Sequence, residues 1–439
     1  MTVRTRFAPS PTGRVHIGNM RAAIYNWLFA RNQGGAFLVR VEDTDRERST
    51  PEAIRTVFDA MSWLGMESDE EPVYQSARQD AQLAAAKSLV DRGLAYTSDK
   101  GSEGRGEAIV FRMPKEAISF HDEIKGELTK SAEDMKDLVI VRSNGTPVFH
   151  LANVHDDIDM GVTHVIRGDD HIENTYRHVA LYRALGADVP KFAHLPMIIN
   201  HQGKPYAKRD GDAFVGDFRD RGILPDALFN YLVLLGWSPG DDSEVLSREE
   251  MIKLFSLDRV KSSPAQMDLK KLEWMNGEYI RILPEETLYR ACRDQMTEYG
   301  LEGDDLDDAY FRKVLALMRP RLKRLSEFLD GALYFFADEY KFDEKAVRKR
   351  LDKPAAIEGL SKLRDRYEAL DTFTEETAED ALRKLAEEND ANPASFVHPA
   401  RVAVSGLAGG PGLFEMLALL GRERVLQRLD RAIETYGKS

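Results

Sequence analysis

The amino-acid sequence predicts an α/β fold: a doubly wound parallel sheet carrying an insertion, followed by an all-α C-terminal region. Three observations support this fold class. β-Rich runs and helical periodicity alternate over the first sixty residues, a polar stretch interrupts the pattern after residue 98, and helical periodicity dominates beyond about Leu283. The chain has 439 residues, a length typical of about two to four domains.

The first half of the sheet is expected to contain two strands and two helices. Residues 3–7 and 36–41 carry β-formers, and residues 18–31 and 51–64 place apolar side chains at helical spacing. A strand–helix–strand crossover of this length implies parallel strands with a right-handed connection. Ligands of such a sheet bind at the carboxyl ends of its strands.

Changes in polarity and periodicity divide the rest of the chain into segments. Residues 99–137 are polar and weakly patterned, which is typical of an insertion lying over the first half of the sheet, and β-rich runs follow at 138–142 and 164–167. We expect five segments: 1–98, 99–190, 191–240, 241–310 and 311–439. Helices are expected at 310–329, 344–349, 354–369, 375–389 and 413–436, with Pro393, Pro399 and residues 409–411 as breaks.

Composition narrows the class of protein. The sequence has no run near the roughly 20 apolar residues of a membrane span and no secretory signal at its amino terminus. The single cysteine, Cys292, excludes an internal disulfide and a Cys-based zinc site, so we expect a cytoplasmic protein without a membrane partner. The net charge of −13 counts against nucleic-acid binding, but the 61 basic residues could gather on one face, which leaves that question open.

The strongest motif is PSPTGRVHIGN at residues 9–19, between the first strand and the first helix. Its prolines fix the exit from the strand, Gly13 and Gly18 allow the backbone to approach a ligand closely, and the helix that follows presents free N–H groups to an anion. His16 stands at that edge and can donate hydrogen bonds to phosphate oxygens. The alternative, an ordinary turn with a surface histidine, is disfavoured by the length of the whole string.

Two charged side chains at strand ends suit an amino-acid ligand. Glu42 ends the second strand, where its carboxylate could hold an ammonium group, whereas residues 43–45 are good candidates for capping the next helix. Arg167 follows a β-rich run, and its guanidinium suits bidentate binding of a carboxylate. The alternative for Arg167 is a structural ion pair with Asp169 or Asp170.

A glycine-bounded basic loop, GKPYAKRDG, spans residues 203–211. Its adjacent cations Lys208 and Arg209 suit the β- and γ-phosphates of ATP, because they would neutralise the charge that grows on leaving pyrophosphate. The alternative is an ordinary basic surface loop. His194 and Trp274 are expected to be core residues rather than ligands.

These strings resemble the glutamyl-tRNA synthetase family of class I aminoacyl-tRNA synthetases. Residues 8–19 are similar to the family's HIGH signature with its preceding Ala-Pro-Ser-Pro-Thr-Gly, and residues 203–211 are similar to its KMSKS loop. The resemblance implies a class I Rossmann-type catalytic domain in segments 1–98 and 191–240. It further implies an acceptor-binding insertion, a stem-contact region and an anticodon-binding domain in segments 99–190, 241–310 and 311–439, respectively.

The resemblance implies the reaction as well. L-glutamate would be activated with ATP to glutamyl-adenylate and transferred to the 3′ end of tRNA-Glu, with release of AMP and pyrophosphate. The expected partners are therefore ATP, L-glutamate and tRNA-Glu, and whether tRNA-Gln is also charged is left open. We expect a monomer.

The resemblance assigns roles position by position. Catalytic roles fall to His16, Gly18, Lys208 and Arg209. ATP-binding roles fall to Pro9, Ser10, Thr12, Gly13, His16, Gly18, Asn19 and Lys208. Glutamate-binding roles fall to Arg6, Ala8, Ser10, Glu42, Asn153 and Arg167. tRNA-binding roles fall to Arg319, Arg321 and Arg324.

The chain departs from the family pattern at three positions. Phe149 stands where many members have a tyrosine whose hydroxyl can bind the substrate. Pro205 and Ala207 stand in place of a lysine and a serine of the signature loop, and Lys204 could supply part of the missing charge.

The expected cofactor is Mg²⁺, which would accompany ATP. No zinc is expected. The stretch that carries a Cys-rich zinc site in some relatives has no cysteine here, and His121 alone cannot form a tetrahedral site.

Three alternatives are weighed against this assignment. Glutaminyl-tRNA synthetases end in β-barrel domains, whereas this C-terminal third has helical periodicity. The truncated glutamyl-queuosine synthetases lack an anticodon-binding domain. A catalytically silent paralogue that only binds tRNA or a partner remains compatible with the altered signature loop.

Overall fold

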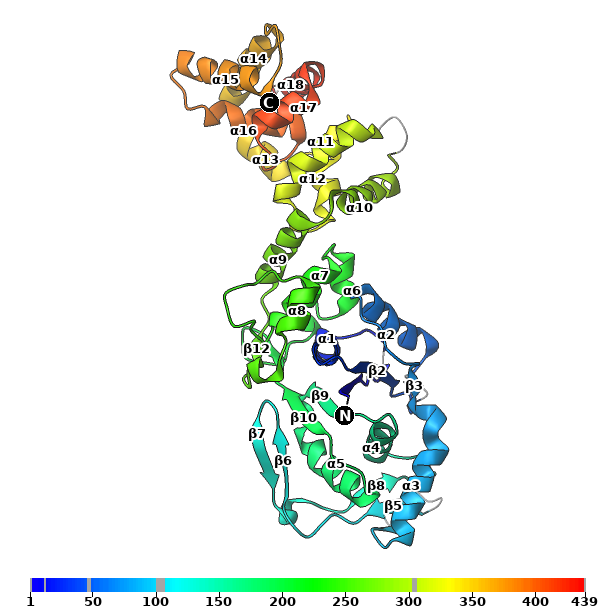
Figure 1. The fold of residues 1–439 in the computed structure, drawn as a ribbon. Coiled ribbons are helices and arrows are strands. Elements are labelled where there is room, and N and C mark those ends of the chain that lie inside the picture. Colours follow the sequence, from blue (N-terminus) through cyan, green and yellow to red (C-terminus); the bar gives the residue numbers. More distant parts are fainter. Residues whose placement is uncertain (1, 12, 46–48, 100–106, 302–305, 438–439) are drawn as a thin grey trace. The chain divides into compact units, whose positions relative to one another are not determined.

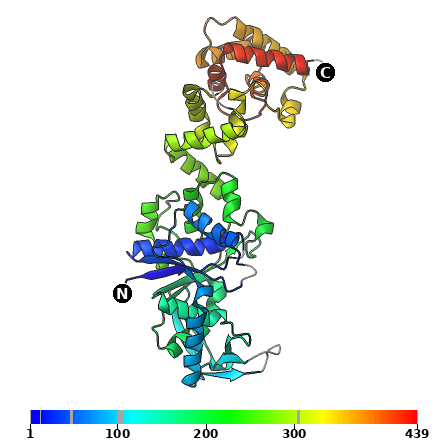
Figure 2. The same cartoon turned by 90° about the vertical axis from the view of Figure 1, so that its right-hand side faces the viewer.

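The computed structural model describes residues 2–11, 13–45, 49–99, 107–301 and 306–437. The chain divides into two compact units, Met1–Met275 and Asn276–Ser439, which are described separately (Figures 1 and 2). Among the described helices, none is long and apolar enough to cross a membrane.

The amino-terminal unit begins with a parallel sheet of β1 (Arg4–Phe7), β2 (Ala36–Val41) and β3 (Val73–Tyr74). Helices α1 (Ile17–Asn32) and α2 (Pro51–Trp63) connect these strands, so the predicted strand–helix order is confirmed. Gly35 is required before β2, because a Cβ atom there would lie 2.2 Å from the carbonyl oxygen of Val3.

The second half of the parallel sheet consists of β9 (His164–Gly168) and β10 (Lys191–Leu195), with α4 (Phe149–Asp159) and α5 (Ile172–Leu185) beside them. The backbone N–H of Thr163 donates to the carbonyl of Arg4 at 3.0 Å, and the side-chain amide of Asn26 donates to the carbonyl of Ile166 at 2.8 Å. The carboxyl ends of β1, β2 and β9 therefore lie at one edge.

The described part of the expected insertion, residues 107–137, contains more strand structure than its polar sequence predicts. Strands β4 (Ala95–Ser98), β5 (Ala108–Phe111) and β8 (Leu138–Val141) form an antiparallel sheet. The hairpin β6–β7 (Ile118–Asp122 and Gly126–Lys130) extends the main sheet beside β10, with Asp122 paired to Phe192. The hairpin does not lie over the first half of the sheet, as was expected of this segment, because β6 pairs in parallel with β10 of the second half.

Helices that follow the second half-sheet pack against α1. They are α7 (Pro225–Leu234) and α8 (Arg248–Leu254), and α6 (Val215–Asp220) comes just before them in the chain. The short parallel pair of β11 (Ile198–Ile199) and β12 (Ala265–Gln266) joins a segment before α6 to one after α8. The rings of Trp27 and Phe229 pack edge-on with their centroids 5.8 Å apart, and those of Tyr25 and Phe255 do so at 5.2 Å. Residues 235–247 connect α7 to α8.

The carboxyl-terminal unit is helical in all its described secondary structure, which confirms the predicted α character. After α9 (Leu269–Ile282), its helices are α10 (Glu285–Glu298), α11 (Asp308–Met318), α12 (Glu327–Phe336), α13 (Glu344–Arg350), α14 (Pro354–Glu368), α15 (Glu375–Glu388), α16 (Ala394–Ser405), α17 (Leu413–Leu420) and α18 (Arg422–Tyr436).

Three helix predictions for this unit are wrong. The single helix expected at 310–329 is two helices, because Pro320 lies in a 3₁₀ turn between them. The helix expected at 413–436 is divided by Gly421, whose φ of 81° no ordinary helix residue adopts. Pro399, expected as a break, lies inside α16.

Candidate active site

A cavity of about 520 Å³ opens at the carboxyl ends of β1, β2 and β9. The predicted site residues on its wall are Arg6, Ala8, Pro9, Ser10, His16, Gly18, Asn19, Glu42, Asn153 and Arg167. Gly13, Lys208 and Arg209 are outside its lining, and Thr12 lies outside the described residues. Segments as distant as β1 and α4 thus bring the predicted ATP- and glutamate-binding residues to one place.

His16 caps the helix that begins the site. Its Nδ1 atom accepts a hydrogen bond from the backbone N–H of Gly18 at 3.1 Å, so the ring proton of neutral His16 belongs on Nε2. Burial lowers the pKa of His16 below its ordinary value, and a hydrogen bond with the Tyr206 backbone opposes this by raising the pKa. His16 is therefore a neutral hydrogen-bond donor at pH 7.

Glu42 and Asp170 are the acidic residues of the cavity lining, and Glu42 lies on its β2 side. The Glu42 carboxylate accepts from the side-chain amide of Asn153 at 2.7 Å and from the Ser10 hydroxyl at 3.4 Å, and it lies 3.4 Å from a nitrogen of Arg40. Burial raises the pKa of Glu42, against the opposing charges of Arg40 and Arg6. The Asn153 Oδ1 atom is buried without a hydrogen-bond partner among the described groups. Glu42 and this oxygen together suit an ammonium group.

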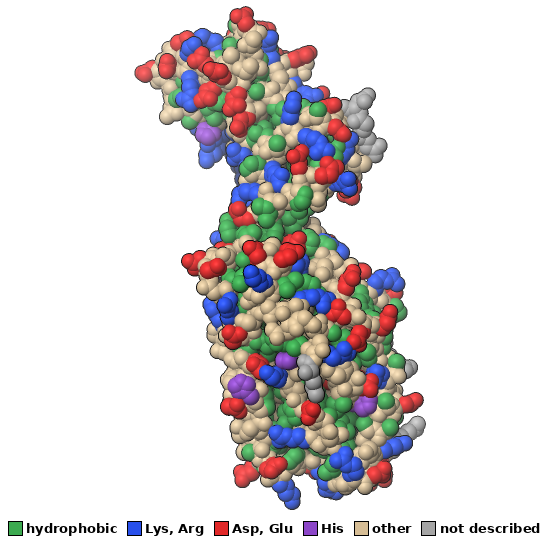
Figure 3. Space-filling model, in the orientation of Figure 1, with side chains coloured by type: hydrophobic (Ala, Val, Ile, Leu, Met, Phe, Trp, Pro, Cys, Tyr) green, Lys and Arg blue, Asp and Glu red, His purple; other side chains and the backbone are tan. Residues whose placement is uncertain are grey.

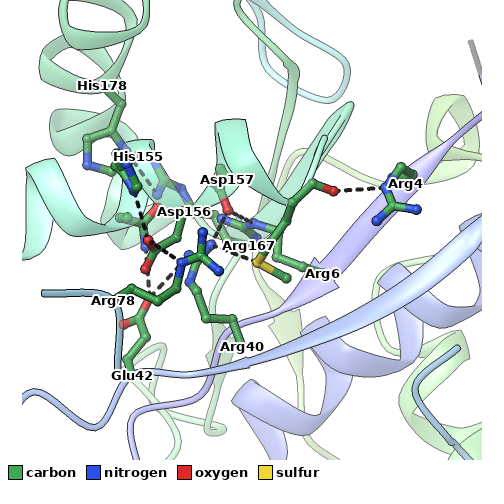
Figure 4. A network of polar contacts seen from close by, with 12 residues as sticks. Arg4, Arg6, Arg40, Glu42, Arg78, His155, Asp156, Asp157, Arg167 and His178 are labelled. Atoms are coloured by element: carbon green, nitrogen blue, oxygen red, sulfur yellow. Dashed lines mark hydrogen bonds and ion pairs between the residues drawn. The ribbon is translucent and has the colours of Figure 1, made fainter. Parts of the chain in front are cut away.

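Arg6 and Arg40 converge on a buried carboxylate, Asp157 of α4 (Figure 4). The Nε atom of Arg6 lies 3.1 Å from Asp157, and Arg40 makes a shorter contact with the same oxygen. Burial alone would raise the pKa of Asp157, but Arg40 and Arg6 hold it below its usual range. The charge of Arg6 is thus fixed in place by a partner within the fold.

Arg167 is held differently. It donates to the Thr175 hydroxyl at 2.7 Å, to His194 Nε2 at 3.4 Å and to His178 Nδ1 at 3.4 Å. Within the described chain, no carboxylate lies at ion-pair distance from Arg167, and burial lowers its pKa to about 10, with the charge of Arg6 acting in the same direction. A buried guanidinium without a carboxylate partner is suited to an anionic ligand.

The alternative ion pair of Arg167 with Asp169 or Asp170 does not form. Asp169 instead pairs with Lys125 at 3.1 Å, and Asp170 lies 3.8 Å from the ring of His171. The helix-capping prediction for residues 43–45 is also wrong. Thr50 caps α2, while Asp43 accepts hydrogen bonds from the backbone N–H and hydroxyl of Ser76 at 2.8 and 2.6 Å.

Sequence reasoning missed several groups beside Arg167. His150, His171 and His178 surround it together with Phe149, whose ring lies 5.9 Å from that of His171. His194, expected as core, is buried, but it is hydrogen-bonded in this group. The same expectation is wrong for Trp274, which is 43% exposed. The recurring histidines of residues 150–178 were the signal available in the sequence.

The basic loop lies beside the cavity wall. Pro205 and Tyr206 line the cavity, and Lys208–Asp210 form the 3₁₀ turn that follows. Asp210 fixes this turn by accepting from the Ala207 backbone N–H at 2.9 Å and from the Asn200 amide at 2.8 Å. Lys208 and Arg209 are exposed. An antiparallel bridge between His16 and Phe214 ties the segment after this loop to the first motif.

In the carboxyl-terminal unit, the three predicted tRNA-binding arginines differ in their surroundings. Arg319 donates to the backbone carbonyls of Ile280 and Arg281 at 3.2 and 2.8 Å, and also to that of Leu283. Arg324 is paired with Glu327 at 3.0 Å, whereas Arg321 is exposed. Basic and acidic side chains intermingle over the face drawn in Figure 3, so this face is not uniformly acidic despite the net charge of −13.

Groups of three or more His, Cys, Asp or Glu side chains that could hold a metal ion are not found among the described residues. Cys292 is buried, and burial raises the pKa of its thiol to about 12. The absence of zinc stays a prediction.

Comparison with known proteins places the chain in a family. Residues 2–105 and 98–274 match the catalytic domain of the class I tRNA synthetases (E and Q), and residues 287–433 match an anticodon binding domain. Glutamate–tRNA ligase 1 of Caldanaerobacter subterraneus is 38% identical, with 98% of each chain covered, and the glutamate–tRNA ligase of Legionella pneumophila (strain Paris) is 39% identical, with 99% and 98% covered.

A solved structure agrees with these relatives. The crystal structure of a glutamate tRNA ligase from Elizabethkingia meningosepticum, in complex with its amino acid, has a TM-score of 0.87 at 30% identity and covers 99% of this chain and 100% of its own. Family models, relatives and fold agree over nearly the whole length: the chain belongs to the glutamate–tRNA ligases, within the class I tRNA synthetases.

Proposed function

We propose that the protein activates L-glutamate with ATP at the β1–β2–β9 cavity and transfers the glutamyl group to the 3′ end of tRNA-Glu. The observation that carries this proposal is the pairing of opposite charges across one cavity. Glu42 and Asn153 offer acceptors for an ammonium group, and Arg6 and Arg167 offer guanidinium groups for carboxylates. L-glutamate carries one ammonium group and two carboxylates, and these groups are complementary to the acceptors and the guanidinium groups of the cavity.

In the first step, an oxygen of the glutamate α-carboxylate attacks the α-phosphorus of ATP. The bond from that phosphorus to the bridging oxygen breaks, pyrophosphate leaves, and glutamyl-adenylate remains. Positioning and electrostatic stabilisation supply the acceleration, since no protein nucleophile is needed. The Nε2–H of His16 and the amino-terminal N–H groups of α1 would donate to phosphate oxygens.

Magnesium would enter as part of the nucleotide substrate, because phosphate oxygens and water supply most of the ligands that Mg²⁺ prefers. Lys208 and Arg209 would neutralise the charge that develops on pyrophosphate. Their exposed turn is held by Asp210 next to the cavity wall, which supports this role. Lys204, on the same loop, would contribute less because it lies further from the turn.

In the second step, a ribose hydroxyl at the 3′ end of tRNA attacks the acyl carbon and loses its proton. The bond between the acyl carbon and the phosphate oxygen breaks, and AMP leaves with that oxygen and the electron pair. We assign the acceptor-binding role to 99–190, the stem-contact role to 241–310 and the anticodon-binding role to 311–439. A match to an anticodon binding domain at 287–433 supports tRNA as the partner. We further propose a monomeric cytoplasmic enzyme, with the mass of 49.6 kDa as the value to test in solution.

Glutamate-dependent exchange of radioactive pyrophosphate into ATP tests the activation step. We expect exchange with L-glutamate and no exchange with L-glutamine, measured with and without tRNA because the family resemblance implies that tRNA completes the amino-acid site. Exchange with glutamine alone would favour a glutaminyl enzyme, and no exchange at all would favour a silent paralogue. Aminoacylation of purified tRNA-Glu and tRNA-Gln then decides whether one or both are substrates.

A further inference from the structure

A buried chain of hydrogen bonds runs from Arg167 to Asp122 on the β6–β7 hairpin. Arg167 donates to the Thr175 hydroxyl at 2.7 Å, and that hydroxyl lies 2.9 Å from His194 Nε2. The other ring nitrogen of His194, Nδ1, lies 2.6 Å from Asp122 Oδ2. Thr175, His194 and Asp122 are at most 1% exposed.

The chemistry of Asp122 determines which ring nitrogen of His194 carries the proton. Burial alone would raise the pKa of Asp122, but His194 and the backbone N–H groups of Ile124 and Lys125 hold it below its usual range. An ionised carboxylate only accepts, so His194 carries its proton on Nδ1 and presents a lone pair at Nε2. That lone pair can accept from the Thr175 hydroxyl and from Arg167 Nε, which lies 3.4 Å away.

The hairpin itself is fixed beside Arg167. Lys125, in the β6–β7 turn, pairs with Asp169 at 3.1 Å and donates to the carbonyl of Ser262 at 2.7 Å. Four separate elements, β6, α5, β9 and β10, therefore supply one residue each to a continuous line of donors and acceptors ending at Arg167.

We propose that Asp122, His194 and Thr175 are positioning residues that orient Arg167 toward a carboxylate of the glutamate substrate. Resting on the proposed function, this inference assigns a role to the hairpin at residues 118–130 in reading the amino acid. Arg167 has no carboxylate partner within the described chain, so neutral acceptors fix its direction without cancelling its charge. The full positive charge stays available to the substrate.

The substitution Asp122→Asn tests the direction of the bonds. Asparagine can keep one oxygen for the N–H groups of Ile124 and Lys125, which preserves the turn, while its NH₂ group faces His194. His194 would then carry its proton on Nε2, placing a donor against the Nε–H of Arg167. The Thr175 hydroxyl, which also donates to the carbonyl of His171 at 3.1 Å, can turn to accept from this proton. We expect the KM for glutamate to rise on the order of tenfold, as for loss of one charge-assisted contact, with the KM for ATP unchanged.

Thr175→Val tests the same line from a different element. Valine removes the acceptor of Arg167 and keeps the shape, so we expect a similar rise in the KM for glutamate, while Thr175→Ser restores it. The double variant D122N/T175V should show less than the product of the two single effects, because both act through Arg167. Asp156→Asn is the matched control: Asp156 is equally buried and accepts from Gln82 and Arg78, none of which touches Arg167.

The measurements distinguish a failure of this inference from a failure of the proposed function. If D122N and T175V lower the melting temperature but leave the KM for glutamate at the wild-type value, the residues are only structural and the proposal is overturned. The same holds if D156N raises this KM as much as D122N does. If D122N does not fold, T175V, which leaves the hairpin intact, decides alone. Wild-type protein without glutamate-dependent exchange would instead refute the proposed function.

Discussion

The Nδ1 atom of His16 accepts a hydrogen bond from the backbone N–H of Gly18, 3.1 Å away, at the first turn of α1. One imidazole therefore does two things. It caps the helix with Nδ1, and it keeps Nε2–H as a donor on the wall of the cavity. The two roles use different ring nitrogens, so substitution can separate them.

His16→Asn should keep the cap and lose the donor at the cavity. Asparagine is among the best capping residues because its side-chain oxygen accepts from the N–H groups of the first turn. We expect wild-type stability and activation slowed by on the order of 100-fold, the typical cost of one transition-state donor. His16→Ala should slow activation equally and also lower the free energy of unfolding by about 1 kcal/mol. Urea unfolding and pyrophosphate exchange measure the two effects, and full activity of H16N would refute the phosphate role.

The basic loop offers a matched pair of lysines. Lys208→Ala should reduce glutamate-dependent pyrophosphate exchange by on the order of 100- to 1,000-fold, because charge developing on pyrophosphate would lose its neutralising partner. The side chain is exposed, so the melting temperature should not change. Lys204→Ala, an exposed lysine of the same loop, should have a much smaller effect. Equal losses in the two variants would show that the loop contributes only general positive charge.

The sequence predicted which residues meet at the cavity where these residues lie in one short segment or at neighbouring strand ends. Residues 9–19 and Glu42 are near each other along the chain or at adjacent strand ends, so the strand–helix pattern sufficed to bring them together. Asp122 was missed because its role depends on contact with His194, 72 residues away, inside a segment whose polar composition resembles a loop. Asp122 and His194 come into contact only in the folded chain.

Phe149 tests the most evident departure from the family pattern. The ring lines the cavity near His171 and lacks the hydroxyl that a tyrosine would offer to the substrate. We expect Phe149→Tyr to lower the KM for glutamate several-fold, since one hydrogen bond contributes about 1 kcal/mol. Steady-state kinetics with varied glutamate measures this change. A higher KM would mean that the histidines around Phe149 leave no room for the added oxygen.

Arg319 and Arg321 should respond differently to alanine. Arg319 donates to backbone carbonyls at the end of α9, so Arg319→Ala should lower the free energy of unfolding by about 1–3 kcal/mol. Arg321 is exposed, so Arg321→Ala should leave stability unchanged, weaken tRNA binding and reduce the slope of log K against log salt by about 1. Lys313→Ala, at another exposed position of the unit, is the control. Unchanged tRNA affinity and salt slope in R321A would remove Arg321 from the interface.

The helix boundaries show a second limit of sequence reasoning. Periodicity alone joined α11 to α12 and α17 to α18, because apolar residues continue at helical spacing across both junctions. Pro320 and Gly421 end the helices there, whereas Pro399 is accommodated inside α16. A proline or glycine thus has an effect that depends on how the neighbouring turns pack.

Neutral buried histidines predict that the protein loses stability in mild acid. Burial lowers the pKa of His150 to about 4, aided by the charges of Arg177 and Arg167, and lowers that of His178 well below its ordinary value. The pKa is also lowered at His16, His164, His171, His194 and His398. The hydrogen bonds of His150 and His178 agree with neutral rings. Arg167 donates to His178 Nδ1, and His178 Nε2 lies 3.2 Å from His150 Nδ1.

The sign of the change in the free energy of unfolding with pH follows from the number of protons that each state binds. In the unfolded chain histidine takes up a proton near pH 6.5, whereas His150 in the fold does so only near pH 4. Between these values the unfolded state binds more protons, so the free energy of unfolding falls as the pH is lowered. The raised pKa of Glu42 acts in the opposite direction, but it is one group against several. Above pH 7 neither state holds these protons, and histidine contributes no slope.

Urea unfolding at pH 7.5, 6.0 and 5.0 measures this loss. His150→Gln should reduce the slope between pH 6.5 and 4.5, because glutamine cannot take up a proton in the unfolded chain. Its stability at pH 7.5 serves as the internal reference for packing effects. A wild-type free energy of unfolding that is constant from pH 7.5 to 5.0 would contradict the neutral state of His150 and His178, and with it the hydrogen bond that His178 accepts from Arg167.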